Sequence, residues 1–247
     1  MSAHPVTDAF RRDGCAVIED VLDGAAVERL RVAIIAIPEG EAVRKRRGVY
    51  GVRNLLEISD DVRRLAGSAV LRRFVTPILG DAAFAARAIF FDKVPGANWS
   101  LGWHQDSVIS VTARCAVPGF DAWSRKAGVW QVQPPAEVLG AMMAVRVHLD
   151  DCPVDNGALR VIPGSHVHGW LDDEIDDWKA RGLVTTCPVR CGGVVLMRPL
   201  LLHASPPSRR AGHRRVIHIE YACEELPGEL DWNNRVGVGH GGRRRCQ

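Results

Sequence analysis

The hydrophobic pattern of the first eighty residues is typical of helices. In residues 25–36, Val27, Leu30 and Ile34 fall on one helical face, and Asp23 stands where it can cap the segment. A second helical pattern runs from about residue 60 to residue 79. Two short apolar segments, residues 15–20 and 49–56, indicate strands within this part of the chain.

From about residue 83 the pattern changes to short β-like runs separated by glycine and proline turns. Eight such runs favour an antiparallel sandwich or barrel over alternating βα units. Residues 171–181 predict a polar helix, and residues 111–133 predict a long loop. Because the early helices need a sheet to pack on, we expect one domain over residues 1–247. It divides into a mostly helical part (1–82), a barrel core (83–225) and a tail (226–247).

Composition adds little that is specific. The 247-residue chain is 47% hydrophobic, 25% charged and carries a formal net charge of +3, so we expect no nucleic-acid partner. The basic runs at residues 44–47, 209–215 and 243–245 are short and favour solvated faces. No signal peptide or membrane-spanning stretch stands out, which predicts a cytoplasmic protein without a membrane partner. The chain has seven scattered cysteines. Cys187 and Cys191 are four residues apart, but no second pair stands at zinc-ribbon spacing, so we interpret them as isolated small hydrophobic residues and not as a metal site.

A candidate metal site begins with His104 and Asp106 in the run GWHQDSV. Residues two apart in a strand point to the same face, so both side chains project together. His203, in LLHASPPS, follows another predicted strand and is the best third ligand among the later histidines. Two histidines and one carboxylate form the facial set that holds Fe(II) and leaves positions free for other ligands. A His-x-Asp pair alone is weak support, because such a strand is more often a polar solvent face.

A second signal lies eleven residues beyond His203. Arg214 opens the strand RVIHIEYA, where its planar guanidinium offers two parallel donors to a carboxylate beside the metal, such as the C5 carboxylate of 2-oxoglutarate. Ser205 shares strand parity with His203 and can donate its hydroxyl to the same carboxylate.

With these residues in place, the chain resembles the phytanoyl-CoA dioxygenase family of Fe(II)- and 2-oxoglutarate-dependent oxygenases over most of its length. The resemblance rests on FDKVPGANWSLGWHQD (91–106), RVHLDDCPVDNGALRVIPGSHVHG (146–169) and HASPPSRRAGHR (203–214). It implies a mainly β fold with flanking helices, a double-stranded β-helix of the jelly-roll, cupin-like type. It also implies iron on His104, Asp106 and His203, and 2-oxoglutarate on Ser205 and Arg214.

Several other inward positions have two possible explanations. The family often places an aromatic residue where this chain has Arg146, and strand parity turns Arg146 inward, toward 2-oxoglutarate, a substrate carboxylate or Asp150. Lys93 is in phase to reach the pocket, although a lysine at a strand end is more commonly a solvated cap. His148 and His218 also have inward parity and favour hydrogen-bonded core histidines over catalytic bases.

Candidate substrate residues come from two segments. Arg53 can line an entrance or form surface hydrogen bonds. Residues 111–133 carry Trp123, Trp130, Gln131 and Gln133, and a long loop of this composition beside a metal site is either a substrate lid or a packed loop.

The function that follows is oxidation of a small-molecule C–H bond, with hydroxylation as the default outcome and succinate and CO2 as co-products of 2-oxoglutarate and O2. Two alternatives use the same barrel: a redox-silent metal hydrolase or isomerase, and a non-catalytic small-molecule binding protein. The first leaves Arg214 and Ser205 without an assigned anion, and the intact metal triad and Arg214 argue against the second. We expect a monomer or a small homo-oligomer.

Overall fold

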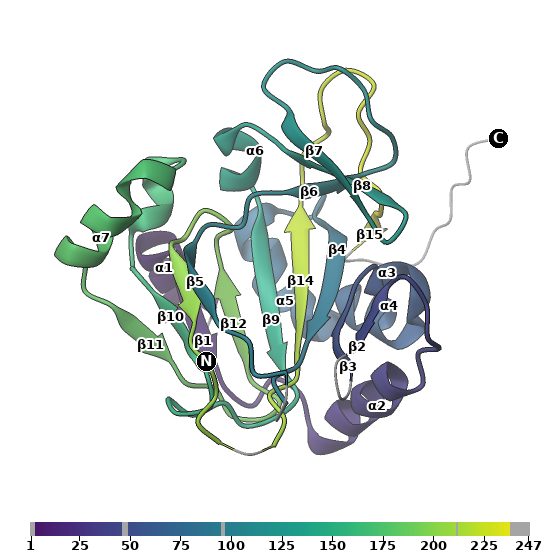
Figure 1. Cartoon of the computed structure of the whole chain (residues 1–247), viewed down its shortest axis with the longest axis vertical. Coiled ribbons are helices and arrows are strands. Elements are labelled where there is room, and N and C mark those ends of the chain that lie inside the picture. The colour runs from purple at the N-terminus through teal and green to yellow at the C-terminus, as the bar shows by residue number, and fades with distance from the viewer. Residues whose placement is uncertain (1–2, 46–48, 95–96, 211, 238–247) are drawn as a thin grey trace.

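The computed structural model describes residues 3–45, 49–94, 97–210 and 212–237. Its largest element is a sheet with the strand order β1-β12-β9-β14-β4-β3-β2, with β15 paired to β4 (Figure 1). The strands are β1 (Cys15–Ile18), β12 (Val194–Met197), β9 (Met143–His148), β14 (Val216–Ala222), β4 (Phe84–Phe91), β3 (Val49–Val52), β2 (Val43–Lys45) and β15 (Val236–Gly237).

Two smaller sheets complete the β structure. One has the order β11-β10-β13-β5, made of Thr185–Cys187, Leu159–Val161, His203–Ser205 and Leu101–His104. The other has the order β6-β8-β7, made of Ile109–Val111, Val129–Gln133 and Asp121–Lys126. All eight predicted β runs contain a strand. The large and the four-stranded sheet face each other across one cavity, and among the described residues their hydrogen-bonded ladders stay separate, so the predicted barrel is an open sandwich.

The helices lie mainly before β4. They are α1 (Ala3–Asp13), α2 (Gly24–Ile35), α3 (Leu55–Ile58), α4 (Asp60–Ala66) and α5 (Ala69–Leu79), followed later by α6 (Ala136–Gly140), α7 (Ile175–Arg181) and two 3-10 turns, Ser165–His168 and Asp172–Glu174. The predicted cap is confirmed, because the Asp23 carboxylate accepts from the Ala26 N–H at 2.7 Å. The helical pattern of residues 60–79 is two helices, since Ser68 caps a new one at the Leu71 N–H.

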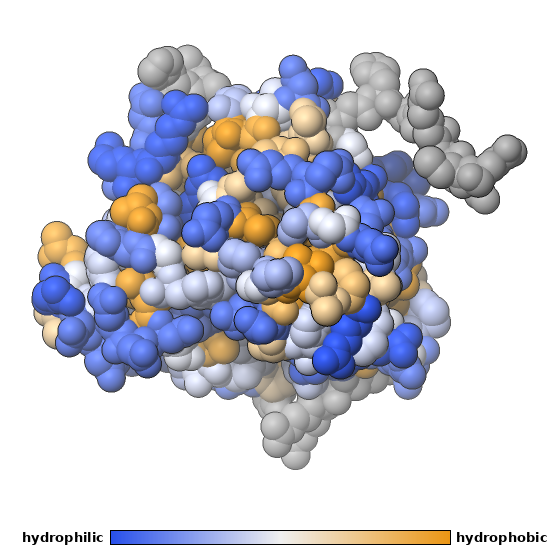
Figure 2. Space-filling view, turned by 90° about the horizontal axis from the view of Figure 1, so that it is seen from above, coloured by the Kyte–Doolittle hydropathy of each residue, from blue (hydrophilic) through white to orange (hydrophobic). Residues whose placement is uncertain are grey.

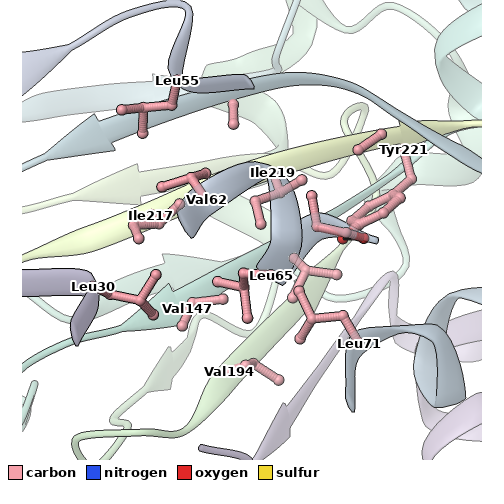
Figure 3. Packing of buried hydrophobic residues seen from close by; sticks show 14 of the residues in the cluster. Leu30, Leu55, Val62, Leu65, Leu71, Val147, Val194, Ile217, Ile219 and Tyr221 are labelled. Carbon is pink, nitrogen blue, oxygen red and sulfur yellow. Dashed lines mark hydrogen bonds between the residues drawn. The ribbon is translucent and has the colours of Figure 1, made fainter. Parts of the chain in front are cut away.

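The helices α1 to α5 cover the outer face of the large sheet. Leu30, Val62 and Leu71 are buried against the alternating side chains of β9 and β14, among them Val147 and Ile219 (Figure 3). Each fully buried side chain of this size contributes roughly 1.5–3 kcal/mol to folding. The alternate residues of the same strands form the inner face, which lines the cavity.

The part predicted to be mostly helical, residues 1–82, also contributes strands to the large sheet. Its strands β1, β2 and β3 extend the large sheet at both ends, because β1 pairs with β12 and β3 pairs with β4. The tail is likewise partly integrated. Leu226, Leu230 and Trp232 are buried, and β15 pairs with β4, while the basic run at residues 243–245 lies outside the described residues.

The prediction of a long loop at residues 111–133 was wrong. The segment contains β7 and β8, a hairpin that turns at Ala127 and Gly128, both with positive φ, and β6 pairs with its second strand. Val129, Gln131 and Val132 of β8 are buried, and Val132 belongs to a second hydrophobic core. The error arose because tryptophan, glycine and proline content outweighed the strand alternation of VWQVQ.

The surface above this hairpin sheet is mixed. Figure 2 shows that hydrophilic residues cover most of this upper face and that hydrophobic residues form several separate patches among them. No helix among the residues in the described ranges is long and apolar enough to cross a membrane.

Asp150 ties α2 to the large sheet. Arg215 donates to both of its carboxylate oxygens, from Nε at 2.9 Å and Nη2 at 2.7 Å, and Arg31 of α2 donates from Nη2 at 3.0 Å. Arg31 also donates from Nε to the Leu149 carbonyl at 3.0 Å. Arg215 therefore faces away from the cavity, as its strand parity predicts.

Replacing Arg215 with alanine should lower the free energy of unfolding by roughly 1–2 kcal/mol, since charge-assisted bonds to a partly exposed carboxylate are lost. Burial raises the pKa of Asp150, but the hydrogen bonds and charge of Arg215 outweigh it and lower the pKa overall. The stabilisation is therefore fully present above the unfolded-state pKa of about 3.9 and is lost as pH falls through the lowered folded-state pKa. Urea unfolding should show a larger difference at pH 7 than at pH 3; equal stability at pH 7 would contradict the assignment.

Candidate metal centre

His104 and His203 lie side by side on neighbouring strands of the four-stranded sheet. They are paired in the register of β5 and β13, and their ring centroids are 4.1 Å apart. The Nδ1 atom of His104 is 2.8 Å from the Gly102 carbonyl, and that of His203 is 2.8 Å from the Leu201 carbonyl. A carbonyl only accepts, so each Nδ1 carries the proton and each Nε2 keeps a free lone pair. This is the arrangement in which histidine binds a metal through Nε2.

Asp106 completes the group. Its Oδ1 atom is 3.8 Å from His203 Nε2, and one ligand atom from each of the three residues lies within 4.8 Å of the others. The backbone N–H of Asp106 donates to the Pro199 carbonyl at 2.9 Å, which fixes the turn after β5. In the described part of the chain, this is the one His, Cys, Asp and Glu group with such spacing, and neither Cys187 nor Cys191 belongs to one.

The charges of the group suit a divalent cation. Burial raises the pKa of Asp106, but His203, His218 and His104 lower it to about 2, so the carboxylate is ionised. Burial lowers the pKa of His203 to about 3, which keeps its imidazole neutral. Metal ligands must be deprotonated in this way, with histidine neutral and carboxylate charged.

Arg214 lies deep beside this group and is 1% exposed. Its backbone N–H donates to Asp92 at 3.0 Å, and its Nη1 donates to the Gly157 carbonyl at 3.2 Å and to Ser205 Oγ at 3.3 Å. Its Nε and Nη2 atoms are buried and have no hydrogen-bond partner among the described residues. Burial, together with the charge of Arg146, lowers the pKa of Arg214 to about 10, so it stays charged at neutral pH. A buried cation with two free donors is suited to a carboxylate.

Lys93 joins the same polar group and is not a solvated strand end. Its ammonium is 1% exposed and donates to Ser205 Oγ at 2.9 Å, to the Ser205 carbonyl at 3.2 Å and to the Pro206 carbonyl. It also lies 4.6 Å from the centre of the Trp99 ring. Burial and the nearby Arg214 lower the pKa of Lys93 to about 7. Lys93 and Arg214 therefore hold Ser205 between them.

Arg146 lines the cavity, as its parity predicts. Asp150 is not its counterion, because Asp150 pairs with Arg215 and Arg31. The Nη1 atom of Arg146 is 3.3 Å from His218 Nδ1, and its Nε has no partner within the described ranges.

The two inward histidines differ in their contacts: His218 Nδ1 is within hydrogen-bond distance of Arg146 Nη1, as expected of a hydrogen-bonded core histidine, whereas His148 has no such contact among the described residues. His218 lines the cavity, with its Nε2 atom 3.9 Å from Asp106 Oδ2 and 3.4 Å from Glu220 Oε1. His148 is 1% exposed, and neither of its ring nitrogens has a partner among the described residues. Burial lowers its pKa well below the usual value, so its imidazole is neutral.

Sequence reasoning missed several residues that line the cavity. Arg87 and Phe91 alternate with core residues along β4, and this alternation was the signal that could have revealed them. Arg87 donates to Glu220 at 3.0 Å. The full lining is Arg87, Ile89, Phe91, Trp99, Leu101, His104, Asp106, Arg146, Leu159, His203, Ser205, His218 and Glu220.

The residues predicted to contact substrate do not line this cavity. Trp123 and Trp130 pack edge to face at 6.3 Å in the β7–β8 hairpin, and Gln131 is 1% exposed with an unpartnered Oε1. Gln133 is the last residue of β8, and Arg53 follows β3. Their role in substrate binding stays a prediction.

Most of the chain matches a known protein family. Residues 10–216 match the family described as Phytanoyl-CoA dioxygenase (PhyH). The chain belongs to the phytanoyl-CoA dioxygenase family. The members of this family are Fe(II)- and 2-oxoglutarate-dependent oxygenases, so the chain is an enzyme of this type. The search of curated proteins gives no match.

Solved structures share the fold of this phytanoyl-CoA dioxygenase family member. AviO1 from Streptomyces viridochromogenes Tue57 is similar over 92% of this chain and 97% of its own, with 24% identity and a TM-score of 0.67. The epimerase SnoN in complex with Fe3+, alpha ketoglutarate and nogalamycin RO is similar over 97% of this chain and 96% of its own, with 19% identity and a TM-score of 0.67. EctD from S. alaskensis with 2-oxoglutarate and 5-hydroxyectoine is similar over 90% of this chain and 76% of its own, with 20% identity and a TM-score of 0.70. These likenesses confirm the jelly-roll type of fold.

Proposed function

We propose that this phytanoyl-CoA dioxygenase family member hydroxylates a C–H bond of a small molecule, using Fe(II) on His104, Asp106 and His203. The balanced reaction takes substrate, 2-oxoglutarate and O2 to the hydroxylated product, succinate and CO2. Iron and 2-oxoglutarate together supply the activation of O2. Zinc or another redox-silent metal would not supply that chemistry.

The observation that carries the proposal is the pair of free donors on Arg214. Nε and Nη2 are buried without partners beside a set of metal ligands, and an unpaired buried cation is costly unless an anion joins it. The C5 carboxylate of 2-oxoglutarate fits this pair. Ser205 Oγ accepts from Lys93 and Arg214, and its hydroxyl donates to the Gly157 carbonyl at a long 3.4 Å, a bond that it can exchange for one to the same carboxylate.

Arg146 is a further buried cation at the cavity, on strand β9 next to β14. Its Nε is free and its guanidinium lies against His218, whose imidazole approaches Asp106. We assign Arg146 to an anionic group of the bound co-substrate or substrate. Leu159, Ile89 and Phe91 give the cavity apolar walls, which limit water around the reacting carbon.

A redox-silent hydrolase and a non-catalytic binding protein are the competing functions. Neither gives a reason for three buried cations, Lys93, Arg146 and Arg214, around a cavity with one metal-binding group. Proteins with a similar fold include the alpha ketoglutarate dependent carbocyclase SnoK and epimerase SnoN, so oxidation without hydroxylation is the main variant of the proposed reaction.

The proposal predicts that purified protein binds one Fe(II) per chain and converts 2-oxoglutarate slowly to succinate even without substrate. Succinate and bound metal are measured in the same samples, with Zn(II)-loaded protein as the control. Zinc that iron cannot displace, together with no succinate under any condition, would overturn the proposal.

A further inference from the structure

Two arginines continue the inner face of the large sheet beyond the metal ligands. Arg87 of β4 lines the cavity. Arg44 of β2 pairs with Gly51 of β3, which pairs in turn with Phe91, another lining residue. Directly paired residues on antiparallel strands share a face, so Arg44 lies on the cavity side. Consistent with this, a Cβ on Gly51 would lie 3.9 Å from the Arg44 Cβ and Cδ atoms, so the Arg44 side chain passes over Gly51.

A third arginine and a lysine come to the same place. Val52 is fully buried on the outer face, so the next residue, Arg53, turns toward the inner face. The amide of Asn54 donates to the Ala127 carbonyl at 2.9 Å, which holds the tip of the β7–β8 hairpin against this segment (Figure 1). Lys126, at the end of β7, therefore stands beside Arg53.

We call Arg44, Arg53, Arg87 and Lys126 the cation cluster. Only Arg87 is neutralised, by Glu220 at 3.0 Å; within the described ranges the other three form no ion pair and no side-chain hydrogen bond. Burial, followed by the charges of Arg44 and Arg87, lowers the pKa of Arg53. Burial, followed by the charges of Arg53, Arg87 and Arg44, lowers the pKa of Lys126. Arg44, Arg53 and Lys126 therefore leave uncompensated positive charge beside the Arg87–Glu220 pair, and this charge favours a bound anion.

Exposure rises along the cluster. The Arg87 side chain is 13% exposed within the cavity, Arg53 is half-buried, and Arg44 and Lys126 are exposed. A ligand can therefore enter past Lys126 and Arg44 and keep one end among these cations while its other end extends toward Asp106.

We propose that the cation cluster binds a phosphate or carboxylate group of the substrate, and that the enzyme therefore acts on an anionic small molecule. This inference rests on the proposed function, since it assigns the substrate class of that site. The cluster has only four cations, and one of them, Arg87, lines the cavity, which fits one anionic group better than the long phosphate backbone of a nucleic acid.

The test uses protein loaded with Mn(II) and saturated with 2-oxoglutarate, so that the metal ligands and Arg214 are already occupied. Phenyl phosphate is compared with phenol, and benzoate with benzyl alcohol, by the broadening that bound Mn(II) causes in their proton NMR lines. We expect the anion of at least one pair to bind roughly tenfold or more tightly than its neutral partner. Arg53→Gln and Lys126→Gln should each weaken that binding by roughly three- to tenfold.

The matched control is Arg72→Gln, which removes a surface arginine that lies 3.5 Å from Asp81. Equal binding of anions and neutral compounds, no binding of either anion, or unchanged affinity in both cluster variants would overturn the inference. So would displacement of phenyl phosphate only by RNA or DNA. Binding of 2-oxoglutarate is recorded first on each sample; its failure would count against the proposed function, whereas normal 2-oxoglutarate binding without anion selectivity would count against the cation cluster alone.

Discussion

Replacing His104 or Asp106 with alanine is expected to lower turnover of 2-oxoglutarate by roughly a hundredfold or more, to a level near the background. Loss of a residue that merely orients a metal ligand typically costs about 10- to 100-fold in metal affinity or activity, and loss of the ligand itself should cost at least as much. In this chain Asp106 supplies the only carboxylate of the group, and His104 supplies an Nε2 lone pair oriented by the Gly102 carbonyl.

Both variants should keep the fold. His104 and Asp106 are half-buried at the cavity, and neither belongs to a hydrophobic cluster. The control is His168→Ala, which removes an exposed histidine that stacks on Trp178 at 4.8 Å. Succinate formation and far-UV circular dichroism are measured for all three. Activity near wild type in either ligand variant would mean that the metal is held elsewhere.

Replacing Arg214 with methionine should weaken 2-oxoglutarate binding by roughly ten- to a hundredfold, because a charge-assisted pair of hydrogen bonds is lost. The same change should leave the melting temperature of the 2-oxoglutarate-free protein equal or higher. Arg214 is fully buried, close to Lys93 and Arg146, with two unpaired nitrogens, so methionine removes an unfavourable charge at similar volume. Its backbone bond to Asp92 is unaffected.

A loss of 2-oxoglutarate affinity without a loss of melting temperature distinguishes a binding residue from a structural one. At a 2-oxoglutarate concentration that saturates only the wild type, the melting temperature of the wild type should rise clearly more than that of Arg214→Met, since a ligand stabilises the folded state according to its concentration relative to Kd. Arg215→Ala is the neighbouring control: it loses the Asp150 pair and stability but should bind 2-oxoglutarate as the wild type does. A large loss of stability in Arg214→Met with unchanged 2-oxoglutarate affinity would reverse the assignment.

Much of the site followed from periodicity and spacing. Strand parity predicted that His218 faces inward, and the structure places His218 and Glu220 at the cavity and Ile217 and Ile219 in the core on the opposite face. It works because one face of the strand is apolar throughout, which fixes the register. That His104 and Asp106 project together could be predicted from local strand geometry alone. Their proximity to His203 depends in addition on the pairing of β5 with β13.

Other features depended on contacts that no local pattern encodes. Lys93 is at a strand end in the sequence, and only the approach of Ser205 and Pro206 buries it. The cation cluster draws on β2, β3, β4 and the β7–β8 hairpin, and the Asn54 bond to Ala127 brings the last of these into place. The basic run at residues 44–47 was predicted to be a solvated face; its Arg44 is exposed but points over Gly51 toward the cavity, and residues 46–47 lie outside the described ranges.

The central claim is that one site holds the metal and 2-oxoglutarate together, and calorimetric titration of 2-oxoglutarate under anaerobic conditions tests it most directly. Fe(II)-loaded protein should bind one 2-oxoglutarate per chain, roughly tenfold or more tightly than metal-free protein, because chelation by the metal adds to the pairing with Arg214. Equal affinity with and without Fe(II), or no binding to the Fe(II)-loaded protein, would contradict the account.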